Sequence, residues 1–127
     1  MAWKGGQVTS KKIDAEIDFS KLVVTQMDRC NLALSQGAFQ FSTAVLAFSC
    51  MLAHLRQKDD FYKKEMDELS IVHKGKVEEI KNTKNANSIY QEIQMKTAIK
   101  EYEALVRLCS RNNLFPAKRG ELNTDDD

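Results

Sequence analysis

The sequence predicts an all-α protein whose helices pack against other helices. Only one proline and five glycines occur in 127 residues, so few positions interrupt a helix. Lysine, glutamate, alanine, leucine and glutamine are abundant, and these residues favour helices over a sheet-rich fold. We expect an antiparallel helical bundle of three or four helices, or long helices with coiled-coil packing, completed by oligomerisation.

Helix breakers and caps divide the chain into four expected helices. Their predicted ranges are about 11–35, 38–57, 59–81 and 88–111. The last helix is expected to begin with a capping box made by Ser88 and Gln91, and to end before Pro116. Residues 1–116 form a single domain in this interpretation, and residues 117–127 form a mobile acidic tail.

A long seam of apolar residues supports helix packing. From Ile13 to Leu69 the seam positions recur at alternating steps of four and three. This averages about 3.5 residues, the spacing that keeps one helix face against a partner. The most regular part of the seam is the predicted partner-binding surface. Its residues are Phe41, Val45, Phe48, Leu52, Leu55, Tyr62, Met66 and Leu69.

Gly37 decides how this seam is used, because the seam crosses it without a change of phase. A continuous helix is one option, since a glycine inside a helix costs only about 1 kcal/mol. So long a helix would need a second chain to cover its seam. The other option, which we favour, is a turn at Gly37 that folds the chain back on itself.

Polar side chains interrupt the seam at Ser20, Asn31 and Asp59. A buried Asn31 could fix the register and number of packed helices, as such residues do in coiled coils. Alternatively, Asn31 faces solvent near the end of a helix. Both interpretations of Asn31 stay open at this point.

No charged residue occurs between Cys30 and Leu55, and the stretch 38–55 is largely apolar. One interpretation is a helix surrounded by neighbours in the protein core. The other is a transmembrane helix, because about 20 apolar residues span a bilayer and basic residues follow this stretch. Polar side chains such as Gln40 and His54 dilute the hydropathy, which favours the core.

Charge and cysteine content restrict partners and location. The 19 basic residues oppose 18 acidic ones and the signs mix along the chain, so no basic patch for nucleic acid is evident. Three widely spaced cysteines do not form a typical disulfide framework. We therefore expect free, buried thiols in a reducing intracellular compartment, the cytoplasm first, with membrane association as the alternative.

No pattern of catalytic, cofactor-binding or metal-binding residues stands out, so we predict no enzyme activity, no cofactor and no small-molecule substrate. Cys50 and His54 are four residues apart, but a zinc site needs further ligands. Acid–base pairs at four-residue spacing are expected to be exposed pairs within one helix. Examples are Asp59 with Lys63 and Glu103 with Arg107.

The expected function is that of a non-enzymatic helical interaction protein, acting as an oligomerising subunit or adaptor in a larger assembly. Its partner would be a second copy of the chain or another helical protein. There are two alternatives. One is a single-pass membrane protein anchored through residues 38–55, and the other is a nucleic-acid-binding helical protein, which the balanced charge disfavours.

Overall fold

The computed structural model describes the backbone of residues 2–114 and the side chains of residues 18–114. In this part of the chain every regular element is a helix and no strand occurs, so the predicted all-α fold is confirmed. The five helices are α1 (Ala2–Leu34), α2 (Ala38–Met51), α3 (Ala53–Lys58), α4 (Asp60–Glu79) and α5 (Ala86–Arg111). The tail predicted over 117–127 lies outside the described residues.

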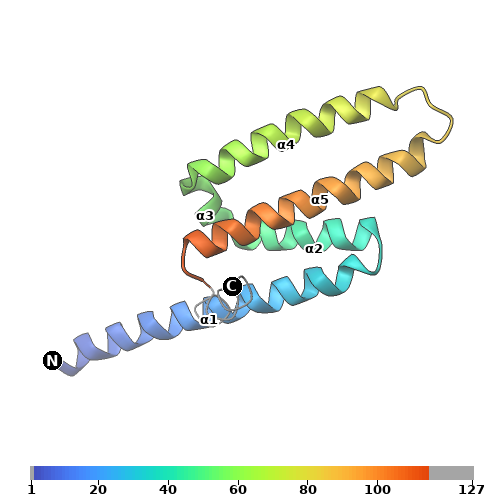
Figure 1. Ribbon diagram of the computed structural model, residues 1–127. Coiled ribbons are helices and arrows are strands. Elements are labelled where there is room, and N and C mark those ends of the chain that lie inside the picture. Colours follow the sequence, from blue (N-terminus) through green and yellow to red (C-terminus); the bar gives the residue numbers. More distant parts are fainter. Residues whose placement is uncertain (1, 115–127) are drawn as a thin grey trace, which may run out of the picture.

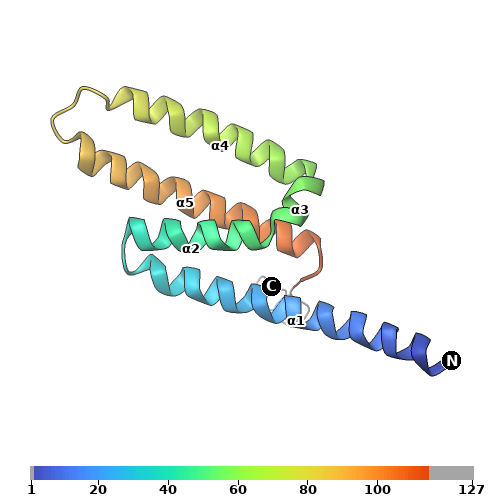
Figure 2. The ribbon, with the colours of Figure 1, turned by 180° about the vertical axis from the view of Figure 1, so that it is seen from behind.

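The long helices lie side by side in the order α1, α2, α5, α4, which differs from their order in the sequence (Figure 1, Figure 2). α2 packs against α1 and α5, and α5 packs against α4. The short α3 leads from α2 across to α4. α1 runs antiparallel to α2, as α4 does to α5, and the N-terminal part of α1 extends beyond its neighbours (Figure 1).

A turn at Gly37 separates α1 from α2. The backbone of Gly37 has φ 116° and ψ 173°, a region that residues with a Cβ rarely adopt. The Gln36 amide donates to the Ala33 carbonyl (2.9 Å), and the Phe41 amide donates to the Gly37 carbonyl (3.0 Å). The first bond closes α1 and the second opens α2, so the chain folds back here and does not continue as one helix.

The helical stretch between Gly37 and α4 is interrupted at Leu52. This buried residue departs from helical geometry, with φ −95° and ψ 14°, and separates α2 from α3. α4 then begins after Asp59, whose backbone is extended and whose Oδ1 accepts a hydrogen bond from the Tyr62 amide (2.8 Å). Asp59 is therefore the N-cap of α4 and not a position on a continuous helical seam.

The start of α5 differs from the prediction. The helix begins at Ala86, and the Ile89 amide donates to the Asn85 carbonyl (3.0 Å). Ser88 therefore lies inside the first turn. The N-cap residue is Asn85, and its side chain makes no capping hydrogen bond. The predicted capping box at Ser88 and Gln91 is wrong, because the helix starts before Ser88.

The core forms where α1, α2 and α5 meet, and Tyr102 of α5 lies within it. The Tyr102 ring packs edge-on against Phe41, with centroids 5.9 Å apart, and lies 6.0 Å from the ring of Phe48. Its hydroxyl oxygen is 3.4 Å from the Met27 carbonyl and 3.2 Å from Asn31 Oδ1, so it can donate to either. Asn31 is thus an exposed residue that accepts a hydrogen bond from another helix.

The apolar stretch 38–55 is divided between α2 and α3. α2 ends after 14 residues, whereas a helix that spans a bilayer takes about 20. In the described part of the chain, no helix is long and apolar enough to cross a membrane. α2 instead buries Phe41, Val45 and Phe48 inside the protein.

Two glycines are expected to respond oppositely to alanine. G37A forces a Cβ onto a backbone with φ +116°, which we expect to lower the free energy of unfolding by about 1–3 kcal/mol. Gly75 lies inside α4, where an added Cβ meets nothing within 4 Å. G75A should therefore raise the free energy of unfolding by up to about 1 kcal/mol. Urea unfolding measures both values, and an unchanged G37A would contradict a strained turn.

Candidate interaction surface

The residues of the predicted partner-binding seam are mostly covered by the chain itself. Five are at most 4% exposed: Phe41, Val45, Phe48, Leu52 and Tyr62. The other three are partly buried: Leu55, Met66 and Leu69. Because α5 covers the inner side of α2, a surface for a partner has to be sought among the exposed residues.

The opposite side of α2 is exposed and also uncharged. Phe39 is 75% exposed and Leu46 is 61% exposed, and Thr43 and Cys50 are exposed as well. These four positions follow one another at steps of four, three and four, which places them on one side of the helix. We call Phe39, Thr43, Leu46 and Cys50 the outer stripe of α2. A helix that is apolar on both sides is typical of one with neighbours all round.

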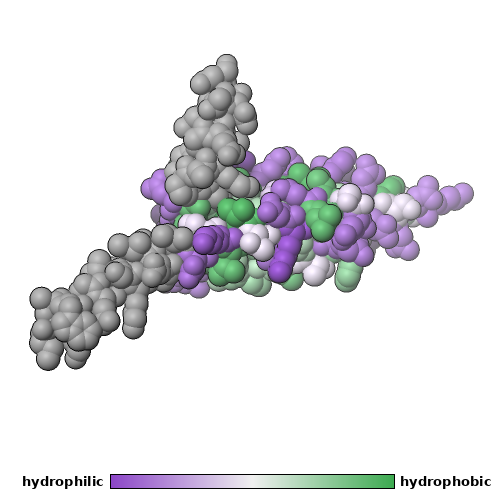
Figure 3. All heavy atoms as spheres, turned by 90° about the horizontal axis from the view of Figure 1, so that it is seen from below, coloured by the Kyte–Doolittle hydropathy of each residue, from purple (hydrophilic) through white to green (hydrophobic). Residues whose placement is uncertain are grey.

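Apolar side chains that are exposed on α4 lie among charges. Phe61 is 71% exposed, but the Arg111 guanidinium lies over its ring, 5.4 Å from the centroid. Ile71 is also 71% exposed and has Glu68 and Lys74 three residues away on either side. Figure 3 shows apolar patches between hydrophilic side chains on the α1 side of the molecule. Among the described helices, α2 alone carries no charged residue.

Two acid–base pairs form between helices. Arg111 donates to both carboxylate oxygens of Asp59, at 2.9 and 3.0 Å. Arg107 is paired with Glu65 of α4, and its Nε lies 2.9 Å from Glu65 Oε2. Because α4 and α5 run antiparallel, these charges face each other across the helix pair. The predicted pairs of Asp59 with Lys63 and of Glu103 with Arg107 are wrong, because Asp59 and Arg107 each bind a residue of another helix.

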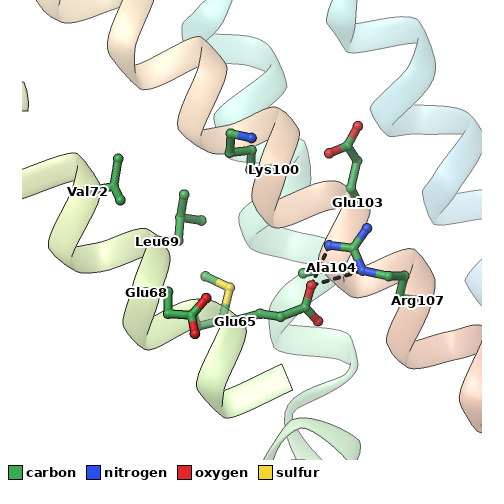
Figure 4. A pocket seen from close by; sticks show the side chains of 9 residues that line it. Glu65, Glu68, Leu69, Val72, Lys100, Glu103, Ala104 and Arg107 are labelled. Carbon is green, nitrogen blue, oxygen red and sulfur yellow. Dashed lines mark hydrogen bonds and ion pairs between the residues drawn. The ribbon is translucent and has the colours of Figure 1, made fainter. Parts of the chain in front are cut away.

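A groove of about 300 Å³ runs between α4 and α5. In Figure 4 the paired side chains of Glu65 and Arg107 lie at the groove, with Lys100 and Glu103 nearby on α5. Acids and bases are both present, so their charges largely offset one another. Within the described residues, no group of three or more His, Cys, Asp or Glu side chains is placed to hold a metal ion. The charge of the groove therefore does not favour a ligand of either sign.

A second polar cluster lies where α3 meets α4 and α5. Arg56 Nε donates to the Ser49 carbonyl (2.8 Å). Burial raises the pKa of the Glu101 carboxyl, and the Arg56 charge opposes this rise. Burial also raises the pKa of Tyr62. These groups line a hollow of about 390 Å³ that again holds both signs of charge.

The three cysteines are free in the structure, but they differ in exposure. Cys30 and Cys109 are buried, and burial raises the pKa of their thiols to about 11 and about 12 respectively. Cys50 is exposed on the outer stripe of α2. The expectation of three buried thiols is therefore wrong for Cys50, because this residue lies on the side of α2 that faces away from the core.

Comparisons with known proteins find no match to a protein-family model, to a curated protein or to a solved structure. The candidate surface therefore rests on the structure and the sequence alone. A signal for it is present in the sequence, because the spacing from Phe39 to Cys50 has the same steps as the inner seam. In an uncharged helix both sets look alike, and only the packing of α5 shows which of them is covered.

The pair of Asp59 and Arg111 is expected to make stability depend on pH. The Arg111 guanidinium holds the pKa of the Asp59 carboxyl below its ordinary value. The pair contributes fully above the pKa of an unfolded aspartate, about 3.9, and this contribution is lost as the pH falls through the lower folded pKa. D59N keeps an N-cap residue and removes the charge. At pH 7 it should lower the free energy of unfolding by roughly 1 kcal/mol.

Urea unfolding of the wild type and D59N between pH 7 and pH 2 measures this contribution. The difference between the two proteins should shrink towards zero at the acidic end. D60N is the matched control. The Asp60 side chain is 99% exposed, and its contact with Lys63 is weak because the two charged atoms are 3.9 Å apart. A difference between the wild type and D59N that does not vary with pH would contradict the assignment.

Cys50 is expected to be the fast-reacting thiol of the folded protein. The thiolate is the reactive form of cysteine, and the raised pKa values of Cys30 and Cys109 keep these two groups protonated at pH 8. A disulfide reagent such as Ellman's reagent should therefore release one equivalent rapidly and two more only on unfolding. C50S should abolish the rapid phase, whereas a second rapid thiol in the wild type would show that the core is open.

Proposed function

We propose that this chain is a non-enzymatic helical interaction protein, a subunit or adaptor that joins a larger assembly. The observation that carries the proposal is the outer stripe of α2. Exposed helix faces of globular proteins usually carry charged and polar residues, whereas this stripe exposes 75% of Phe39 and 61% of Leu46 without a charge on the helix. Exposed apolar surface of this kind is typical of sites that bind another protein.

The remaining polar groups support an interaction role over a chemical one. Burial raises the pKa values of the Cys30 and Cys109 thiols, and a protonated thiol is a poor nucleophile. The acids and bases between α4 and α5 pair with one another across the two helices. The buried thiols and the ion pairs between helices are thus typical of groups that stabilise helix packing.

The two sides of α2 have separate roles in this proposal. The inner side, with Phe41 and Phe48, holds α2 against Tyr102 of α5 within the chain. The outer stripe then binds the helix of a partner, and α2 becomes the central helix of a larger bundle. The inner seam would thus support the partner surface from behind, and assembly would complete the bundle.

The proposal is tested by charging the outer stripe. In F39E/L46E both side chains stay at exposed positions, so the free energy of unfolding should change by no more than about 0.5 kcal/mol. Assembly should nevertheless be lost, because a charge buried at an interface without a partner is strongly unfavourable. The measurement is size-exclusion chromatography of the chain in a native extract of its source under mild conditions, with circular dichroism to check the fold.

The matched control is I71E on α4, where the native side chain is 71% exposed and charges already lie nearby. This variant should elute with the wild type in a complex larger than one chain. Elution of the wild type as a free chain would contradict the proposed function. So would a complex that survives F39E/L46E.

A further inference from the structure

We infer that the outer stripe of α2 binds the same stripe of a second copy of this chain, with the two α2 helices antiparallel. The inference rests on the proposed function, since it names the partner of the same surface. Three observations support it: the absence of charge on α2, the order of side-chain sizes along the stripe, and the order of charges along α1.

The absence of charge makes α2 compatible with a two-fold axis. In a symmetric dimer each residue near the axis meets its own copy, so a charge there meets a like charge. α2 carries no charged residue, whereas α4 and α5 expose acids and bases along their lengths. A helix without charge also offers no attraction to a strongly charged partner. A second α2 is therefore a suitable occupant.

The order of side-chain sizes favours an antiparallel arrangement. The large Phe39 stands at one end of the stripe and the small Cys50 at the other, with Thr43 and Leu46 between them. Reversing one helix about the middle of the stripe places Phe39 opposite Cys50 and Leu46 opposite Thr43. Each large side chain then meets a small one, which allows close packing. A parallel arrangement would place Phe39 against Phe39 and leave Cys50 opposite Cys50.

The exposed charges of α1 are complementary in the same arrangement. Asp18 and Arg29 are both exposed on α1 and lie 11 residues, about three turns, apart, so they are on the same side of the helix. Around the helix this side adjoins Gln26, which reaches Ala44 of α2, and is turned away from Asn31, which reaches Tyr102 of α5. In an antiparallel copy Asp18 faces Arg29 and Arg29 faces Asp18, so an acid meets a base at both ends.

One two-fold axis can serve both helices. The side chain of Gln26 donates to the Ala44 carbonyl (3.4 Å), so the middle of the α1 charges lies within about one helical turn of the middle of the stripe. Exposed Leu22 and Leu32 add apolar surface from α1. The face formed by the two helices measures roughly 20 Å by 20 Å. A dimer would bury about 400 Å² on each copy, which is less than the roughly 800 Å² of a stable complex and within the range of weak ones. We therefore expect a reversible dimer.

Cross-linking through the native Cys50 tests the direction of the helices. In the antiparallel dimer the two Cys50 positions are 11 residues apart along the helix direction, about 16 Å, which is too far for a disulfide. A bis-maleimide with a spacer of about that length should link two wild-type chains, whereas mild oxidation should not. In F39C, a disulfide should form between position 39 of one copy and Cys50 of the other, about tenfold faster than in the exposed control I71C.

A charge reversal on α1 provides an independent test. R29D places an acid opposite Asp18 of the other copy twice per dimer, and should raise the dimer dissociation constant about tenfold. D18K/R29D exchanges the two signs and should restore the wild-type value. Sedimentation velocity over a range of protein concentrations measures all three proteins, and neither position lies in the core.

Failure of the inference can be distinguished from failure of the proposed function. A wild-type chain that stays monomeric at all concentrations and is not linked by the bis-maleimide would overturn the inference. Rapid oxidation of wild-type Cys50 to a disulfide-linked dimer would overturn the antiparallel arrangement. If the wild type stays monomeric while F39E/L46E still removes the chain from its complex in the extract, the stripe binds a different helical protein and the proposed function stands. Rapid oxidation of Cys50 also leaves the proposed function standing, because it shows a parallel dimer through the same stripe.

Discussion

The ring of Tyr102 is the contact on which the arrangement of α1, α2 and α5 depends. It packs against Phe41 and Phe48 of α2, and its hydroxyl reaches the backbone of Met27 and the side chain of Asn31 on α1. One side chain thus joins three helices that are separated by up to 75 residues in the sequence. Because its hydroxyl reaches polar atoms at the edge of the core, the partly buried tyrosine can pack its ring on the core and still satisfy its polar group.

The position of α2 between α1 and α5 explains how a helix without charge is accommodated. Its inner side is covered by α5 of the same chain, and its neighbour α1 carries exposed charges along one side of it. The second helix pair, α4 and α5, combines both kinds of contact. Tyr62 and Met66 of α4 belong to the same apolar core as Ala104 of α5, and Arg111 of α5 binds Asp59 at the start of α4.

The all-α fold and the turn at Gly37 follow from local features of the sequence, because breakers and helix periodicity act over a few residues. The inner seam from Phe41 to Leu52 is found from the same periodicity. The partner of each charged residue cannot be found from periodicity, since Asp59 meets Arg111 only through the packing of α4 on α5. For the same reason the exposure of Cys50 could not be predicted. In an uncharged helix, periodicity marks two apolar sides, and only the tertiary packing decides between them.

The distance in sequence between α2 and its cover has a consequence for synthesis. Phe41 and Phe48 emerge from the ribosome long before Tyr102, which follows Phe48 by 54 positions. At roughly 5–20 residues per second this interval lasts about 3–11 s. During that time the α1–α2 hairpin exposes both of its apolar sides at once. The nascent chain therefore passes through a stage in which the apolar α2 is not yet covered by α5. Chaperone binding at this stage would protect it from aggregation.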